Sequence, residues 1–461
     1  VLVGGYLAFS IAGCSDSGVD ILATDILPGE AAGGSASSTV EAVGDAVGRT
    51  TEPAAVGEPG VDDREGIPRV GGQIPAGTEE YNPSPPSPDQ EMPPNSIPVN
   101  RIWGIETSSL SGQDRLGFIS GAGADWVRRN AVFWSEVEPI QGARNWSVLA
   151  DLELELVSAS EQEIEVVLLV RSTPGWAQAV PGLTCGPIDS TALPAFADFM
   201  AELVSRYSQA PYNVSYYEIW NEPDVLADGR FIDPESPFGC WGDRQESFYG
   251  GGDYAEVLAA VYPQVKAANP RAQILVGGLL LDCDPVNPPT LPGGDVKDCS
   301  SAKYLEGILQ SGGGDYFDGI SFHAYDYYGG ELGQYGNSNW GSSSKLNGPV
   351  LHAKTRYLRS LLNRYGFPDR YLINSESGLI CGSTDGSEPV CQSADFYLTK
   401  AYYASVAYAG AIAEQLEANI WYSLNGWRAS GLLDRDGQPQ PVYDAFTFSA
   451  QELRDADYIS R

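Results

Sequence analysis

The chain has 461 residues, enough for one large domain with an appendage or for two modest domains. Its 61 acidic and 27 basic residues give a formal net charge of −34, which argues against nucleic acid or an anionic membrane surface as a partner. The same charge weakly disfavours polyanionic substrates, although a single site is able to override it locally.

The first of the seven cysteines, Cys14, stands apart from the other six. Residues 7–13 (LAFSIAG) are apolar and end in two small residues, so residues 11–14 resemble the lipobox of a bacterial lipoprotein signal peptide. No basic n-region or initiator Met precedes them, and we expect residues 1–14 to be the end of a longer signal. An ordinary signal peptide with a chance cysteine is the alternative. Lipidation of Cys14 predicts an extracytoplasmic protein, anchored by lipid at a bacterial cell surface or in the periplasm.

Residues 15–98 are rich in Gly, Ala, Ser, Pro, Glu and Asp, with few aromatic residues and no sustained periodicity. Such a composition buries too little apolar surface to offset the entropy lost on ordering. We therefore expect a disordered tether, stiffer over the proline-dense residues 81–98, ahead of a folded domain at residues 99–461. A cleaved pro-segment is the alternative.

From residue 101 onward, short β-rich runs alternate with helical patterns, which is typical of βα units and a parallel sheet. Strands are predicted at residues 102–105, 125–133, 164–170, 214–220, 274–277, 319–324, 371–375 and 419–424. Helices are predicted at residues 193–207, 254–268, 350–365, from a cap at Ser393 to about 417, and at 443–455. Eight repeats predict an α/β fold, a (β/α)8 TIM barrel with enlarged loops, and a doubly wound open sheet is the runner-up.

Two of these strands end in a glutamate. Asn221-Glu222-Pro223 follows the fourth strand, and Pro223 has no N–H with which to continue a ladder. Glu376 follows the seventh strand in the same way. In parallel α/β proteins the catalytic residues lie at the carboxyl ends of the strands. A glycosidase needs at least two carboxyl groups. The alternative is that both are solvated loop carboxylates.

Asn221-Glu222-Pro223 and Ser375-Glu376-Ser377-Gly378 together resemble the two motifs of glycoside hydrolase clan A. The resemblance covers residues 101–446. It implies a retaining (β/α)8 enzyme in which Glu222 is the general acid/base and Glu376 is the nucleophile. It also implies that Asn221 binds the sugar hydroxyl next to the anomeric carbon.

Two further strands carry polar residues that agree with this resemblance. On the second strand Arg128 is expected to point inward and keep Glu376 ionised, as clan members have an arginine there, although the adjacent Arg129 competes for the assignment. On the sixth strand His323-Ala324-Tyr325 resembles the His-x-Tyr of the clan, so Tyr325 is expected to donate its hydroxyl to Glu376. An ordinary ion pair and a structural histidine are the alternatives.

Aromatic residues are frequent in the loops that follow the strands, and flat sugar faces stack on such rings. By resemblance, Trp427 after the eighth strand is expected to floor the subsite of the cleaved sugar, with Trp421 as a competitor. Trp176 is expected to bind substrate as well. Each ring has packing as its alternative role; the set is Trp176, Trp241, Tyr327, Tyr328, Trp340 and Trp427.

The six remaining cysteines all fall in loops after predicted strands three, four, five and seven, on one face of the barrel. Six cysteines allow fifteen pairings. Closeness in the sequence favours a disulfide between Cys283 and Cys299 and another between Cys381 and Cys391. Cys185 and Cys240 are then left to form the third. A metal site is less favoured, because Cys-x-x-Cys spacing is absent and the chain has two histidines.

The leading hypothesis is a secreted, retaining glycoside hydrolase that needs no cofactor and acts on a neutral polysaccharide or oligosaccharide. Residues 134–139 and 431–437 look more like family 39 or the looser members of family 5 than like family 10. A non-catalytic carbohydrate-binding lipoprotein is one alternative, although binding alone does not need both glutamates. A glycan-remodelling transglycosylase would use the same residues. The membrane enters only through the lipid anchor, and nucleic acid is not expected as a partner.

Overall fold

The computed structural model describes residues 100–112, 114–226, 238–382, 386–456 and 458. Cys14, the expected signal and the expected tether lie outside these residues. None of the helices in the described residues combines the length and the hydropathy that a membrane-spanning segment requires.

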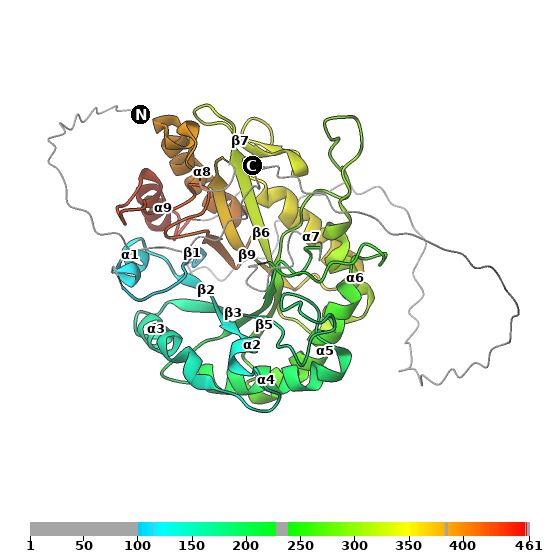
Figure 1. Cartoon of the computed structure of the whole chain (residues 1–461). Helices are drawn as coiled ribbons and strands as arrows, with labels where there is room; N and C mark the ends of the chain where they lie inside the picture. Colours follow the sequence, from blue (N-terminus) through cyan, green and yellow to red (C-terminus); the bar gives the residue numbers. More distant parts are fainter. Residues whose placement is uncertain (1–99, 113, 227–237, 383–385, 457, 459–461) are drawn as a thin grey trace, which may run out of the picture. The chain divides into compact units, whose positions relative to one another are not determined.

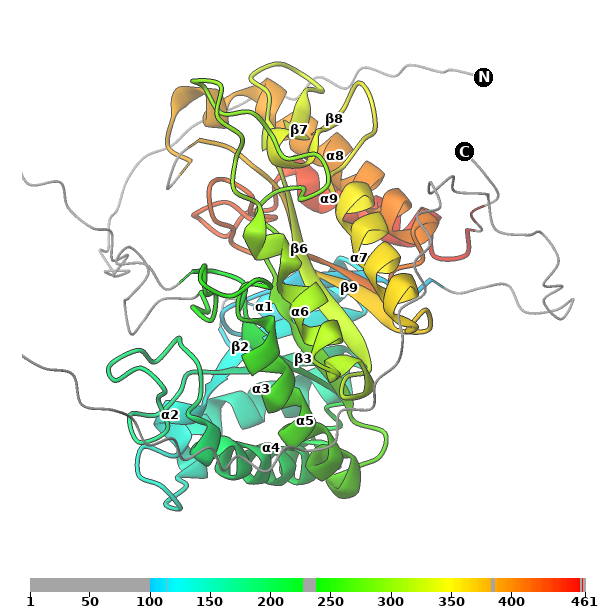
Figure 2. The same ribbon diagram turned by 90° about the vertical axis from the view of Figure 1, so that its right-hand side faces the viewer.

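Eight parallel strands form a closed barrel. Their order is β5-β4-β3-β2-β1-β10-β9-β6, and pairing of β5 with β6 closes the ring, which excludes the open doubly wound sheet. Figure 1 shows these strands in the middle of the domain, and Figure 2 shows their length in side view. The predicted (β/α)8 barrel is therefore confirmed. The strands are β1 (Trp103–Glu106), β2 (Trp126–Phe133), β3 (Glu165–Arg171), β4 (Tyr216–Asn221), β5 (Gln273–Leu279), β6 (Gly319–Tyr328), β9 (Tyr371–Ile380) and β10 (Ala418–Trp421).

Helices surround the barrel, as Figure 1 shows. Their amphipathic stripes pack on the outer faces of the strands, and in α4 the seven buried residues run from Phe196 to Tyr207 along one side. Ser393 caps α8 as predicted, because its hydroxyl accepts the N–H of Phe396 at 3.1 Å. The larger helices are α3 (Ala150–Glu161), α4 (Leu193–Tyr207), α5 (Gly251–Ala268), α7 (Leu351–Tyr365), α8 (Ala394–Ala413) and α9 (Pro441–Glu452), and the shorter ones are α1 (Arg115–Gly121), α2 (Trp134–Val137) and α6 (Tyr304–Gln310).

The loops at the carboxyl ends of the strands are enlarged. The loop after β6 carries an antiparallel extension, β7 (Tyr335–Asn337) and β8 (Ser342–Ser343), which continues the β6 ladder beyond the barrel. Asp326 fixes this extension to the barrel, since its carboxylate accepts the hydroxyl of Ser342 at 2.8 Å and the N–H of Val350 at 2.8 Å.

Three disulfides fasten these loops, with the pairing predicted from sequence. Their Cα–Cα distances are 5.4 Å for Cys185–Cys240, 5.2 Å for Cys283–Cys299 and 5.6 Å for Cys381–Cys391. The first joins the loops after β3 and β4, and the other two each close a single loop.

The barrel interior has an apolar layer near the amino ends of the strands. Trp126, Val167, Leu275, Ile373, Ala418 and Ile420 form this layer. Side chains two residues further along a strand point to the same face. On β2 that residue is Arg128, which lies above Trp126, and on β4 it is Glu218, which lies above Tyr216. Charged groups therefore replace the apolar layer toward the carboxyl ends of the strands.

Candidate active site

Arg128 is the centre of the charged layer. Its side chain is fully buried and donates from Nη1 to Glu106 Oε2 at 2.7 Å and to Glu376 Oε1 at 2.5 Å. From Nη2 it donates to Glu218 Oε1 at 2.5 Å and to Asn221 Oδ1 at 2.7 Å. One guanidinium thus joins the ends of β1 and β4 to the middle of β9, because β9 continues to Ile380 and Glu376 lies within it rather than after it. Arg129 points the other way and pairs with Glu155 on α3 at 2.7 Å, so it does not compete for this place.

Glu222 leaves the barrel through a sharp turn at the end of β4. Trp220 has φ 72° and Glu222 has φ 45°, a region that side chains with a Cβ rarely adopt. Two contacts hold this turn: Glu222 N donates to Gly278 O at 2.9 Å, and Trp220 Nε1 donates to Cys185 O at 3.0 Å. The turn directs the Glu222 carboxylate back over the barrel mouth, where it is 3% exposed. Backbone strain of this kind is common at functional sites.

His323 is the hydrogen-bond partner of Glu222. Its Nδ1 lies 2.7 Å from Glu222 Oε1, and the other oxygen of Glu222 is buried without a hydrogen-bond partner among the described residues. The imidazole fits closely against β5, because a Cβ built on Gly278 would lie 2.2 Å from His323 Nε2. Gly278 therefore leaves space for the His323 ring, and that ring in turn positions the Glu222 carboxyl group.

Glu376 is held from both of its oxygens. Arg128 donates to Oε1, and the hydroxyl of Tyr325 donates to Oε2, as expected from the sequence. His323 Nδ1 lies 3.4 Å from the same Oε2. Glu376 therefore lies between a cation, a phenol and an imidazole, with 7% of its surface exposed.

The buried carboxyl groups differ in proton affinity. Burial raises the pKa of Glu222 well above its usual value, and the charges of Glu376 and Asp224 raise it further. Burial also raises the pKa of Glu376, but Arg128 and the Tyr325 hydrogen bond oppose this rise. Burial raises the pKa of Glu106 to about 8, against the charge of Arg128.

Burial lowers the pKa of the His323 imidazole well below its usual value, so this ring is neutral at neutral pH. Arg128 and the lysine at position 354 lower the same pKa further. A neutral imidazole has one donor and one acceptor nitrogen. Its Nδ1 is therefore able to accept a hydrogen bond from a protonated Glu222 or, in the other tautomer, to donate one to the Glu222 carboxylate.

The donor atoms of Glu222, His323 and Glu376 all lie within 4.8 Å of one another. Such a group is able to hold a cation, but here the donors are turned toward partners within the protein. Nδ1 of His323 faces Glu222, while Arg128 and Tyr325 occupy Glu376. The arrangement fits a pair of hydrogen-bonded carboxyl groups better than a set of metal ligands.

The aromatic residues differ in exposure. Trp421, Trp241 and Trp340 are buried and pack in the protein interior. The Trp427 ring is 44% exposed and lies 6.3 Å from that of Tyr325, so it borders the site, whereas its competitor Trp421 does not. Trp176 is partly buried against Trp134, and its Nε1 donates to Glu138 O at 2.9 Å.

Sequence reasoning missed three contributors to the site. Glu106 and Glu218 are ligands of Arg128, and Tyr422 packs edge-on against Tyr325 with ring centroids 6.0 Å apart. Glu106 ends β1 just as Glu222 follows β4, so the same strand-end signal was present. Glu218 interrupts an otherwise apolar and aromatic strand, which is also a signal.

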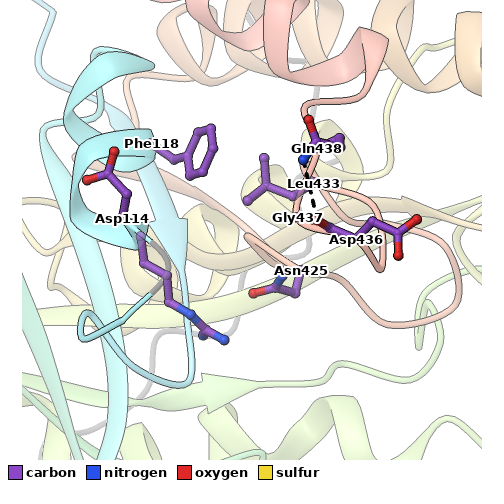
Figure 3. A pocket seen from close by; sticks show the side chains of 8 residues that line it. Asp114, Phe118, Asn425, Leu433, Asp436, Gly437 and Gln438 are labelled. Carbon is purple, nitrogen blue, oxygen red and sulfur yellow. Dashed lines mark hydrogen bonds between the residues drawn. The ribbon is translucent and has the colours of Figure 1, made fainter. Parts of the chain in front are cut away.

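A cavity of about 390 Å³ opens between α1 and the loop after β10 (Figure 3). Since β1 and β10 are neighbours, this cavity and the carboxyl groups lie at the same end of the barrel. Figure 3 shows Phe118 and Leu433 on its walls among polar groups. The lining residues are Asp114, Arg115, Phe118, Asn425, Leu433, Asp436, Gly437 and Gln438.

No protein-family model and no curated protein sequence matches the chain. Solved structures do match. A family 39 glycoside hydrolase from the gut symbiont Bacteroides cellulosilyticus WH2 has a TM-score of 0.54 at 18% identity, over 78% of this chain and 65% of that one. A monomeric beta-xylosidase from Caulobacter crescentus CB15 has a TM-score of 0.51 at 16% identity, over 76% and 68%. GH5_18 from Bifidobacterium longum subsp. infantis has 0.50 at 17%, over 78% and 80%.

The chain shares its barrel fold with these glycoside hydrolases. This agrees with the fold that the clan A resemblance implied, with similarity to families 39 and 5. The match spans just under two thirds of the length of the family 39 protein. At these identities the likeness concerns the fold, so the activity of this chain has to be argued from its own residues.

Proposed function

We propose that the protein is a retaining glycoside hydrolase with Glu222 as general acid/base and Glu376 as nucleophile. The observation that carries the proposal is the pair of buried carboxyl groups, with oxygens within 4.8 Å, in two different environments. Retaining glycosidases have carboxyl groups about 5 to 5.5 Å apart, whereas inverting enzymes need about 6.5 to 9.5 Å to admit a water.

The environments support the two roles. Arg128 and Tyr325 favour the ionised form of Glu376, as a nucleophile requires. Glu222 has no direct cation within 4.0 Å among the described residues, and its raised pKa keeps a proton available. Two titratable groups whose environments separate their pKa values are a common basis for assigning acid and base.

In the first step the Glu376 carboxylate attacks the anomeric carbon and the glycosidic C–O bond breaks. The proton of Glu222 passes to the leaving oxygen. In the second step Glu222 removes a proton from water, whose oxygen attacks the anomeric carbon and releases Glu376. Asn221, fixed by Arg128, is the candidate partner for the sugar hydroxyl beside the reacting carbon.

We further propose an extracellular oligosaccharide or polysaccharide as the substrate. The cavity in Figure 3 and the exposed ring of Trp427 offer room for sugar units beyond the one that is cleaved. The net charge of −34 favours a neutral glycan. Three disulfides fit an oxidising compartment, in line with a lipid-anchored protein outside the cytoplasm.

The test is a panel of oligosaccharides and polysaccharides assayed with the wild type, Glu222→Gln and Glu376→Gln. Both variants keep the shape of the side chain and lose its acid–base or nucleophilic function. We expect each to lower kcat by at least about a hundredfold on a responsive substrate. NMR of the first product is expected to show the anomeric configuration of the substrate. Near-normal turnover in either variant, or inverted product, would refute the proposal.

A further inference from the structure

Lys354 is a buried lysine behind the candidate acid. It lies in the first turn of α7, is 4% exposed, and places its ammonium over the ring of Trp340 at 5.8 Å. Nζ donates to Leu280 O at 2.7 Å and to His323 O at 2.7 Å. Among the described residues no carboxylate oxygen lies within 4.0 Å of it. Its close partners are therefore backbone carbonyls.

These two carbonyls belong to different strand ends. Leu280 directly follows β5, and His323 lies on β6 next to an irregularity in the β6–β9 ladder. The β5–β6 ladder is also irregular between Val276 and Leu279. Carbonyls at such places need partners from outside the ladder. Lys354 supplies one ammonium to both and thereby fixes the spacing of β5 and β6 beside the site.

The contacts form a closed circuit around Glu222, in which hydrogen bonds alternate with short stretches of the chain. Asp224, two residues after Glu222, accepts the N–H of Leu280 at 2.9 Å and that of Leu281 at 2.8 Å. Leu280 accepts from Lys354, Lys354 donates to the backbone of His323, and the His323 ring faces Glu222. Three barrel elements and α7 are thus joined through one cation.

Burial of this cation is unfavourable in itself, because an ammonium loses its hydration there. An apolar side chain of similar length would avoid that loss, as buried charges are often replaceable by apolar groups without loss of stability. A lysine at this place is therefore better explained by what it does to its neighbours than by the stability of the fold.

We infer that Lys354 is a positioning residue for the acid step, which holds the Glu222–His323 pair in register with the strand ends. The inference rests on the proposed glycosidase function. Lys354 does not touch the substrate and acts through the His323 backbone. Loss of Lys354 is expected to weaken proton donation to the leaving group more than attack by Glu376, because Arg128 and Tyr325 hold the Glu376 carboxylate directly.

The charges around Lys354 also determine in which direction its removal shifts the pH dependence of activity. Burial lowers the pKa of Lys354 to about 8, while the carboxylates of Asp224, Asp282, Glu222 and Asp326 act in the opposite direction. The ammonium in turn lowers the pKa of Glu222, together with Arg128, against the charges of Glu376 and Asp224. Removal of the ammonium therefore raises the pKa of Glu222.

The experiment compares Lys354→Met and Lys354→Arg with the wild type, on one glycoside with a good leaving group and one with a poor leaving group. Only the poor leaving group needs strong protonation. Lys400→Met is a matched control: Lys400 is also a buried lysine, on α8, and donates to Ala429 O at 2.7 Å and Gly431 O at 2.9 Å, away from Glu222.

For Lys354→Met we expect kcat/KM to fall about tenfold on the poor leaving group and less than about twofold on the good one, part of what a general acid contributes. The basic limb of its pH profile should move up by about one pH unit, and Lys354→Arg should recover both effects in part. Lys400→Met is expected to lower thermal stability without changing the leaving-group ratio.

An equal loss on both substrates with an unmoved basic limb would reduce Lys354 to a structural role and overturn the inference. If Glu222→Gln itself keeps its activity, the proposed function fails instead, so the two failures are distinguishable.

Discussion

Substitution of Arg128 by Met tests the charged layer most directly. The guanidinium makes five hydrogen bonds of 2.5 to 3.2 Å to four side chains, and all of them are buried. The Met variant leaves Glu106, Glu218 and Glu376 together without a cation. Removal of one partner from a buried ion pair costs about 3 to 5 kcal/mol. For a domain of this size that corresponds to a fall in Tm of about 4 to 7 °C.

The size of this effect depends on pH in a defined direction. Arg128 opposes the raised pKa of Glu106 and of Glu376, so its loss raises both pKa values further. A carboxyl group whose pKa is raised in the folded protein contributes stability that is fully present below its unfolded pKa, near 4.5. That stability is lost as the pH rises through the raised pKa of the folded protein. The Met variant should therefore be less destabilised at pH 5 than at pH 7.

Two assays follow from this reasoning. Thermal unfolding of the Arg128→Met variant and the wild type at pH 5 and pH 7 measures the stability difference. The acid limb of kcat/KM reports ionisation of Glu376 and should move to higher pH in the variant. Arg128→Lys keeps the charge but lacks the planar fork, so an intermediate shift is expected. A folded Met variant with an unmoved acid limb would refute the role given to Arg128.

Two further predictions concern the surroundings of the acid pair and the cavity. Gly278→Ala should lower kcat more than about tenfold with little effect on KM, since the added methyl group would meet His323 Nε2 at 2.2 Å. Gly175→Ala is the control, because a Cβ added there meets nothing within 4 Å. Equal kcat values for the two variants would contradict the role given to Gly278. Asn425→Ala should lower kcat/KM about fivefold on long oligosaccharides and leave disaccharides unchanged, because one lost hydrogen bond is worth about 1 kcal/mol. Equal losses on both would exclude the cavity of Figure 3 as a sugar subsite.

The strands of the barrel were predictable because both of their faces are buried, so each reads as a short apolar run. The helix α3 was not predicted. Its leucines at 152, 154 and 156 alternate with glutamates, which mimics the period of a strand, and in the structure Leu152 is 5% exposed and Leu154 is 69% exposed. Here the helix is set by packing against the barrel, which overrides the local pattern.

The two candidate catalytic glutamates were predictable from their places on the strands, although Glu106 and Glu218 carried a similar signal and were missed, and a residue supplied by a helix was not predictable. Glu222 and Glu376 follow apolar runs and are visible as interruptions of them. Lys354 lies in the first turn of a helix that also carries exposed basic residues, and its sequence neighbours do not distinguish it from them. Its burial comes from the packing of α7 on β6, a contact between distant parts of the chain.

The two buried cations act differently on the pKa values of Glu222 and Glu376. Arg128 contacts Glu376 directly, so it favours the charged form of that group with the full strength of a hydrogen-bonded ion pair. Lys354 does not contact Glu222 directly, and its charge lowers the pKa of Glu222 less than burial raises it. If a cation touched both carboxylates, both would be ionised and neither would hold a proton for the leaving group. The unequal distances of the two cations therefore support one acid and one nucleophile in a space of less than 5 Å.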